Sequence, residues 1–131
     1  MNASNYLEVA ILEHFLRGNT QNSPQNRFFA LYISDPTDAD TGTEVTGSGY
    51  ARQQVSFGPV SQVGGKGTLA NTAKIEFPVA GGAWGTVAYW GVRDALTGGN
   101  LLVHGALSAS KAVAVSDQLV FQAGDITVSA D

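Results

Sequence analysis

Apolar and polar residues follow two different periods along the chain, and the first of them is helical. Near the N-terminus the apolar face recurs every three or four residues, at Leu7, Ala10, Ile11, His14 and Phe15. Ser4 and Asn5 offer side-chain oxygens for an N-cap, and Gly18 can adopt the left-handed conformation that ends a helix. We therefore predict a helix over residues 4–17. Because an isolated helix of roughly 13 residues is only marginally stable in water, we expect it to dock on the chain's own sheet or on a neighbouring subunit.

After residue 26 the pattern changes to short apolar or alternating runs separated by glycine-rich turns, which is typical of strands. The predicted strands are residues 28–33, 50–57, 72–77, 86–93, 101–107, 119–122 and 126–129, with a further short edge strand at 111–115. Six to eight such strands indicate an all-β fold, an antiparallel β-sandwich of the Greek-key or jelly-roll kind. No helix-length segment lies between strands, which excludes parallel βαβ units. We predict a single domain over residues 1–131, with the helix at 4–17 and the sandwich at 27–131.

Composition narrows the function classes. Of 131 residues only 14% are charged, against roughly 25% in an ordinary soluble protein. There is no cysteine, which excludes disulfides and cysteine-ligated metals. A net charge of −4 argues against nucleic-acid binding, which needs clustered Lys and Arg. We expect neither a membrane span nor a secretory signal, because no apolar run is long enough. A surface with so few charges does little to keep copies apart, which favours an assembly component.

The sequence contains no clear catalytic motif. His14 lies on the apolar helix face and His104 in a strand, so both are expected to be structural. Glu44 and Glu76 have no spacing that predicts a glycosidase pair. The acidic segment after residue 34 supplies oxygens that calcium prefers, from Asp35, Asp38, Asp40 and Glu44. Their order is not that of an EF-hand, and turns capped by aspartate explain the same residues. We predict no enzyme activity and no cofactor, with a calcium loop as an alternative for the four acids.

Aromatic residues are the stronger indication of binding. Trp84, Tyr89 and Trp90 cluster in one segment, and such rings stack on sugars, fill protein interfaces or fill a core. Strand alternation places Ala88, Trp90 and Val92 on one face and Val87, Tyr89 and Gly91 on the other. Both faces are apolar, so one forms the core and the other needs a helix, a second sheet or a partner to cover it.

Several segments resemble a family of small tailed-bacteriophage virion proteins, whose members are often labelled tail-fibre or minor structural proteins. The similar segments are SNYLEVAILEHFLRG, LYISDPTDADTGTEVTGSGYARQ, WGTVAYWGVRDALTGGNLLVHGALS and DQLVFQAGDITVS. They cover nearly the whole chain in the same order, and they are turn and packing motifs. The resemblance implies a virion structural protein with no catalytic residues to carry over.

The expected function is a non-enzymatic accessory structural protein of a tailed-phage virion, with capsid decoration preferred over a tail or tail-fibre position. A carbohydrate-binding adhesion module is the alternative from another class. The expected partners are the major capsid protein or tail components and copies of the chain itself, as a dimer or trimer, without nucleic acid or membrane. The predicted contact residues are Leu7, Ile11 and Phe15 of the helix, the loop from Asp35 to Gly49, and the aromatic residues Trp84, Tyr89 and Trp90.

Overall fold

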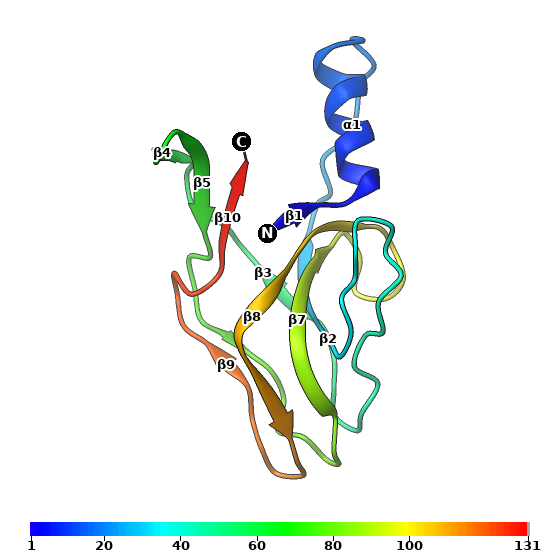
Figure 1. Ribbon diagram of the computed structural model, residues 1–131, viewed down its shortest axis with the longest axis vertical. Helices are drawn as coiled ribbons and strands as arrows, with labels where there is room; N and C mark the ends of the chain where they lie inside the picture. The colour runs from blue at the N-terminus through cyan, green and yellow to red at the C-terminus, as the bar shows by residue number, and fades with distance from the viewer. Residues whose placement is uncertain (131) are drawn as a thin grey trace.

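The computed structural model describes residues 1–130, and antiparallel strands make up most of the regular structure (Figure 1). Within these residues there is one helix, α1 (Asn5–Phe15). The strands are β1 (Asn2–Ala3), β2 (Arg27–Tyr32), β3 (Gln53–Val55), β4 (Ser61–Val63), β5 (Lys66–Ala70), β6 (Ile75–Glu76), β7 (Gly85–Arg93), β8 (Leu101–Val113), β9 (Val120–Phe121) and β10 (Thr127–Ala130). The predicted all-β class with one N-terminal helix is confirmed. Three strands were not predicted: β1 and β4, which have only two and three residues, and β5, which lies in a stretch read as a glycine-rich tip.

The strands form three sheets. The largest has the order β1-β8-β7-β2-β3, the second has the order β10-β5-β4, and β6 pairs with β9 in the third. The smaller sheets lie across one face of the large sheet, in a sandwich-like arrangement (Figure 1). The predicted edge strand at 111–115 is instead the continuation of β8, which pairs with the start of β7. At one end of the molecule, the hairpin of β4 and β5 with β10 and the helix α1 stand apart as two projections (Figure 1).

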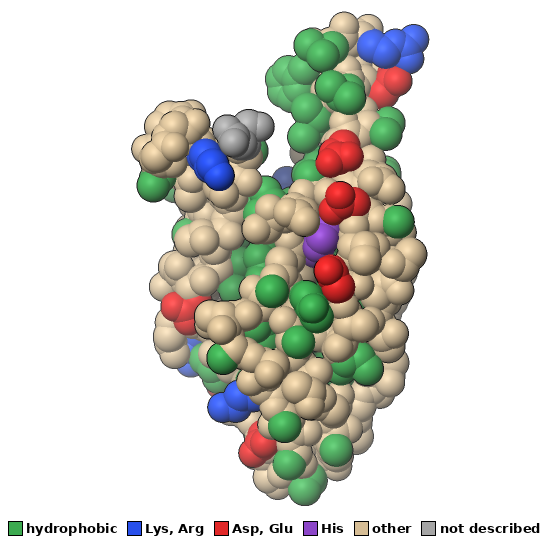
Figure 2. All heavy atoms as spheres, viewed as in Figure 1, with side chains coloured by type: hydrophobic (Ala, Val, Ile, Leu, Met, Phe, Trp, Pro, Cys, Tyr) green, Lys and Arg blue, Asp and Glu red, His purple; other side chains and the backbone are tan. Residues whose placement is uncertain are grey.

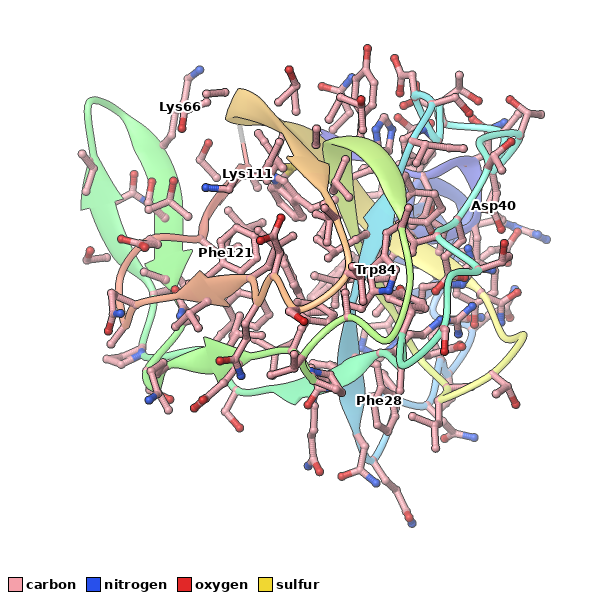
Figure 3. The ribbon with its side chains drawn as sticks, turned by 90° about the horizontal axis from the view of Figure 1, so that it is seen from below. Phe28, Asp40, Lys66, Trp84, Lys111 and Phe121 are labelled. Carbon is pink, nitrogen blue, oxygen red and sulfur yellow. The ribbon has the colours of Figure 1, made fainter. Side chains whose placement is uncertain are left out.

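Aromatic rings fill the core between the sheets. The Phe29 ring on β2 stacks on Trp90 of β7 with a centroid distance of 5.7 Å, and Phe121 of β9 meets it edge-on at 5.2 Å. Phe77 lies 6.1 Å from Phe29 and is fully buried. Figure 3 shows Trp84 and Phe121 among the side chains enclosed by the strands. Each such side chain contributes on the order of 2 kcal/mol through burial, so the sheets stabilise this core without the helix.

A shift in register against β8 accompanies a change in which residues of β7 face the core. The pairing of β7 with β8 is irregular between Val87 and Tyr89. Strict alternation predicts Val87 and Trp90 on opposite faces, yet both are buried in the same hydrophobic core, while Tyr89 is only half-buried. The predicted alternation is therefore wrong across Ala88, where the register shifts: this single residue of β7 lies opposite four residues of β8, 107–110, so the extra residues are on β8.

The second face of the large sheet is covered by a loop. Residues 34–49 pass over Ala30 and Tyr32 of β2 and over His104 of β8, all of which are buried. The loop is tied to the end of β2 by two backbone hydrogen bonds, from Val45 to Leu31 at 3.0 Å and from Ile33 to Thr43 at 2.9 Å. The cover of this face is thus neither a helix, a second sheet nor a partner, but a polar loop of the same chain.

Candidate assembly surface

Helix α1 is attached to the body at its N-terminal end. The Ser4 hydroxyl accepts a hydrogen bond from the Leu7 amide at 3.1 Å and donates one to the Leu101 carbonyl of β8. The Asn5 amide donates to the Asp38 carbonyl of the covering loop at 2.8 Å. Ser4 is thus the N-cap, as its side chain predicted, and the helix begins one residue later and ends two residues earlier than the predicted range 4–17. At the other end Gly18 has a φ of +74°, the predicted left-handed stop.

Beyond this attachment most of the helix surface is exposed to solvent. None of its residues is buried, although the sequence from Asn5 to Phe15 is largely apolar. Phe15 is 75% exposed and the following Leu16 is 77% exposed. In Figure 2, hydrophobic side chains gather on the projection that α1 forms. A helix that is apolar on most of its surface is normally buried, so this one is expected to be covered by something outside the chain.

The apolar residues of α1 form two faces on opposite sides of the helix. One face, which we call the inner face, carries Leu7, Ala10, Ile11 and His14. The other, which we call the outer face, carries Val9, Leu12 and Leu16, spaced three and four residues apart and all exposed. At 100° per residue the two faces point in opposite directions. The sequence pattern identified the inner face and missed the outer one.

The inner face borders a groove with a volume of about 520 Å³. The opposite wall is apolar and comes from three other elements, through Phe57, Leu69 of β5 and Val128 of β10. The large sheet contributes Val92, Leu102 and Val103 to the groove, and Arg27 at the start of β2 also borders it. Of the predicted contact residues, Leu7, Ile11 and Phe15 therefore lie together along this groove. Leu7 is half-buried against the core, and the other two are exposed.

The aromatic contact residues are not on this surface. Trp84 is 4% exposed and Trp90 is 6% exposed, and the Trp84 indole NH donates to the Ser48 carbonyl at 2.9 Å. Tyr89 is half-buried. The interpretation of Trp84 and Trp90 as interface or sugar-stacking residues is wrong. The two-faced apolar pattern of β7 arises because a sheet and a loop of the same chain cover its two sides.

The four acidic residues of the covering loop do not converge on one point. Asp40 makes two hydrogen bonds of 2.8 Å with Arg93 of β7, and Asp38 contacts His104 Nε2 at 2.8 Å. Asp35 accepts from the Thr37 amide at 2.9 Å. Within residues 1–130 there is no group of three metal-binding side chains. The calcium alternative is therefore wrong as a description of these acids, because basic side chains and turn amides already occupy them.

Glu44 belongs to a second arginine cluster. Arg52 donates to both Glu44 oxygens, at 2.7 and 2.8 Å, and also to the carbonyls of Ala95 and Gly98. The Tyr50 hydroxyl donates to Glu44 at 2.7 Å and accepts from the Leu31 amide at 3.1 Å. These bonds join the covering loop to the turn before β8. The sequence contains the residues of both arginine clusters, but only the fold pairs them.

Arg93 is the more buried of the two arginines, with 7% of its surface exposed. Burial alone would lower the pKa of the Arg93 guanidinium, but the hydrogen bonds that it donates to Asp40 and Tyr32 outweigh this effect and raise that pKa. Arg93 also donates to the carbonyls of Gly98 and Gly99. The cluster therefore holds a permanent positive charge whose partners are all supplied by the chain, which is the arrangement of a structural tie.

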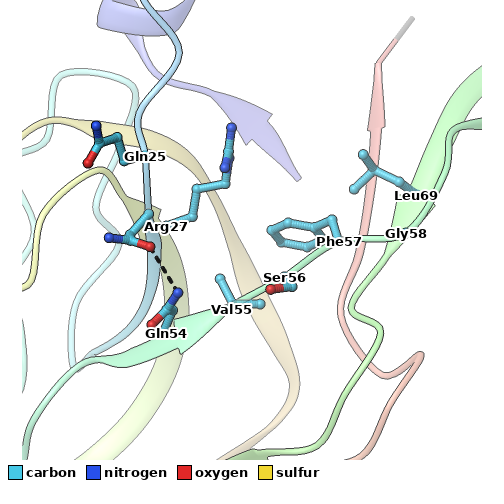
Figure 4. A pocket seen from close by; sticks show the side chains of 9 residues that line it. Gln25, Arg27, Gln54, Val55, Ser56, Phe57, Gly58 and Leu69 are labelled. Atoms are coloured by element: carbon cyan, nitrogen blue, oxygen red, sulfur yellow. Dashed lines mark hydrogen bonds between the residues drawn. The ribbon is translucent and has the colours of Figure 1, made fainter.

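A second, more polar depression adjoins the groove (Figure 4). It has a volume of about 450 Å³ and lies between the start of β2 and the segment that follows β3. The Gln54 amide donates to Asn26 across it at 3.0 Å, and Arg27 borders both this depression and the groove. Its lining is mostly polar, so the depression offers less apolar surface to a partner than the groove does.

The remaining polar residues considered for chemistry are dispersed. His14 is exposed on the helix and His104 is buried under the covering loop. Glu76 pairs with Lys74 at 3.0 Å, whereas Glu44 pairs with Arg52. The helix of the described chain has neither the length nor the apolar character to cross a bilayer.

Comparison with protein families places this surface in context. A search of curated proteins found no match. The family model described as Podophage GP4 fiber I protein gp80 matches residues 2–129, which is nearly the whole chain and includes β1, α1 and both walls of the groove. The predicted resemblance to phage virion structural proteins is thereby confirmed, and the chain belongs to the family of the podophage GP4 fiber I protein gp80.

Proposed function

We propose that the chain is a non-enzymatic structural subunit of a phage fibre, joined to other subunits through α1. The observation that carries the proposal is a largely apolar helix that buries none of its residues while the sheets behind it are well packed. The family to which the chain belongs is described as a fibre protein.

Energetic considerations support an assembly role for the helix. Exposed apolar surface that forms one contiguous patch marks interaction sites on soluble proteins. Here six large apolar residues are exposed along one short segment: Tyr6, Val9, Ile11, Leu12, Phe15 and Leu16. When a partner covers these residues, the free energy of the complex falls by roughly 25 cal/mol per Å² of apolar area removed from water. This stabilisation requires no change in the packing of the sheets.

The absence of enzymatic activity is part of the proposal. Both arginine clusters and His104 bind to residues of the same chain, and their bonds to Glu44, Asp40 and Asp38 hold the covering loop against the body. A catalytic group instead keeps a reactive atom facing a substrate site. These residues are better explained as structural contacts that fix the covering loop to the rest of the chain.

Capsid decoration is the competing virion role, and copy number separates the two. A decoration protein covers the shell in hundreds of copies, whereas a fibre component is present in three to a few dozen. Quantitative mass spectrometry of purified particles measures this ratio against the major capsid protein. We expect a low number, and hundreds of copies would contradict the fibre role.

The contribution of α1 is tested in the phage itself. The double substitution Leu12→Asp and Leu16→Asp places charges on the outer face without touching the core, because both side chains are exposed. We expect particles that lack the protein although it is produced and folded. Ser108→Asp and Ser110→Asp, on an exposed part of β8, form the matched control. Normal incorporation of the Leu12/Leu16 variant would show that the helix is not the attachment.

A further inference from the structure

A third depression, which we call the β8 pocket, lies between β8 and the segment that joins β9 to β10. Its volume is about 490 Å³, within the roughly 300–1,000 Å³ that is usual for small-molecule sites. The middle of β8 forms one wall, and Phe121 of β9 with residues 125–127 forms the other. The pocket shares no lining residue with the groove beside α1, so a ligand bound here leaves the helix surface free.

Trp90 brings an unused hydrogen-bond donor to the β8 pocket. It lines the pocket with only 6% of its surface exposed. Its indole NH donates to no residue of the described chain, whereas that of Trp84 donates to the Ser48 carbonyl. Within residues 1–130 no fully buried side-chain nitrogen lacks a partner, so the Trp90 nitrogen lies in the small part of the ring that is accessible. The NH of a largely buried indole normally has a partner, and this one is free for a ligand.

Gly105 gives a ligand access to this nitrogen. It lies opposite Trp90 in the pairing of β7 with β8, and a Cβ atom at this position would lie 3.0 Å from the Trp90 Nε1 and 2.8 Å from Cζ2. A side chain here would therefore cover the NH edge of the ring. The face of the ring is not available in the same way, because Phe29 stacks on it at 5.7 Å. The pocket thus presents the indole edge for a hydrogen bond and does not present the ring for stacking.

Asp125 adds a hydrogen-bond acceptor on the opposite wall. One of its carboxylate oxygens accepts from the Gln122 amide at 2.8 Å and fixes the turn between β9 and β10. The other oxygen has no hydrogen bond with the described residues, and the side chain is exposed. The Thr127 hydroxyl on the same wall also has no such bond. The pocket therefore combines a free donor on one side with a free carboxylate oxygen and a hydroxyl on the other.

This set of groups selects a ligand rich in hydroxyls. A hydroxyl both donates and accepts, so one hydroxyl of a pyranose ring accepts from Trp90 while its neighbours donate to Asp125. The half-buried side chains of Phe121 and Leu107 offer apolar surface to the C–H groups of the sugar ring. An anion is repelled by Asp125, a simple cation gives the indole NH no acceptor, and an apolar molecule leaves both polar groups unpaired at a cost.

We infer that the β8 pocket binds one pyranose unit of a carbohydrate, held between the Trp90 indole NH and the Asp125 carboxylate. This site goes beyond the proposed structural role, because it lies on a surface that the helix contact does not use. A single sugar unit makes only a few hydrogen bonds here, so we expect a Kd of about 1–10 mM. Many copies on one particle would raise the avidity for a polymer of such units.

The indole signals of the protein report directly on this site. In ¹⁵N-labelled protein, Trp84 and Trp90 give separate indole NH resonances, and the bond to Ser48 makes Trp84 an internal control. The probes are the methyl glycosides of glucose, galactose and mannose, which differ in the orientation of single hydroxyls. We expect at least one of them to shift the Trp90 resonance saturably and to leave the Trp84 resonance unchanged.

Substitution of the free carboxylate tests the assigned contact. Asp125→Asn keeps an oxygen for the Gln122 amide but removes the charge, and should raise the Kd of the bound glycoside roughly tenfold. Asp117→Asn is the matched control, because Asp117 accepts from the Ala114 amide in a similar turn outside the pocket. Its Kd should equal that of the wild type. Thr127→Val, which keeps the shape of the side chain, should weaken binding less than Asp125→Asn does.

Three results would overturn the inference. The first is the absence of a saturable Trp90 shift with all three glycosides at about 100 mM, well above the expected Kd. The second is an equal shift of both indole resonances, which would show that the sugar acts on the whole protein without a site. The third is equal weakening by Asp125→Asn and Asp117→Asn in variants that are folded by circular dichroism. None of these results changes the copy number on particles, so failure here is separable from failure of the fibre role.

Discussion

At the scale of single residues, the stability of the body depends on buried charge pairs. Arg93 and Asp40 join β7 to the covering loop, and Arg52 and Glu44 join the start of β3 to the same loop. Arg93 and Asp40 are 53 positions apart in the chain, whereas Arg52 and Glu44 are only eight apart. They were visible in the sequence as an acidic segment and as arginines within predicted strands, but their pairing follows from which face of the sheet the loop covers.

Asp40→Asn tests the Arg93 tie. Asparagine keeps the shape and tolerates the φ of +58° at this position, so the change removes mainly the charge. Because Arg93 stays buried and loses its carboxylate, we expect the free energy of unfolding to fall by about 1.5–3 kcal/mol. Urea denaturation measures the loss. Glu76→Gln, whose partner Lys74 is exposed, is the matched control and should change stability by less than about 1 kcal/mol. Equal losses in the two variants would contradict the structural tie.

Tyr50 gives the molecule a dependence on alkaline pH. Burial, together with the hydrogen bond to Glu44, raises the pKa of its hydroxyl above the ordinary value near 10. Above that pH the unfolded chain loses a proton that the folded chain keeps, so the free energy of unfolding falls as pH rises.

Tyr50→Phe removes this group and should make the stability curve flatter between pH 9 and pH 11 than in the wild type. At pH 8 the variant should be less stable, because the Leu31 amide and Glu44 lose a partner. Urea denaturation at a series of pH values measures both the slope of the stability curve and the free energy of unfolding at pH 8. Identical slopes for the two proteins would show that Tyr50 does not control the alkaline loss.

At the scale of elements, the periodicity of the sequence predicted the helix and most strands. It did not predict the features that depend on contacts between distant segments. The helix cap and the stop at Gly18 depend on local chemistry and were predicted, whereas the hairpin of β4 and β5 around Gly64 and Gly65 was missed. The register shift between β7 and β8 at Ala88 and the cover of the second sheet face were not predicted either, because both arise from pairing between distant segments. The candidate site was half predicted: the inner face of α1 follows a helical period, whereas the groove exists only where β5 and β10 rise opposite the helix.

Ser4→Ala tests how α1 is held. The Ser4 hydroxyl both caps the helix and donates to β8, so its loss should destabilise the helix by about 1 kcal/mol and leave the sheets folded. Hydrogen exchange should show faster exchange in α1 and unchanged exchange in β2. Ser110→Ala, on an exposed part of β8, is the control and should leave both rates unchanged. Faster exchange throughout the sheets of Ser4→Ala would mean that the helix and the core unfold together.

At the scale of the whole molecule, the structure divides into a packed body and a bare projection, and this division predicts a concentration-dependent change in dynamics. An isolated helix of 11 residues is marginal in water, and α1 gains little from the body because it buries no residue. In dilute solution its amides should therefore exchange far faster than those of Phe29 and Leu31, which are fully buried on β2. If copies associate through α1, raising the protein concentration should slow exchange in the helix and leave the exchange of β2 unchanged. Slow exchange in α1 that is independent of concentration would mean that the helix is stable alone, and that association is not what orders it.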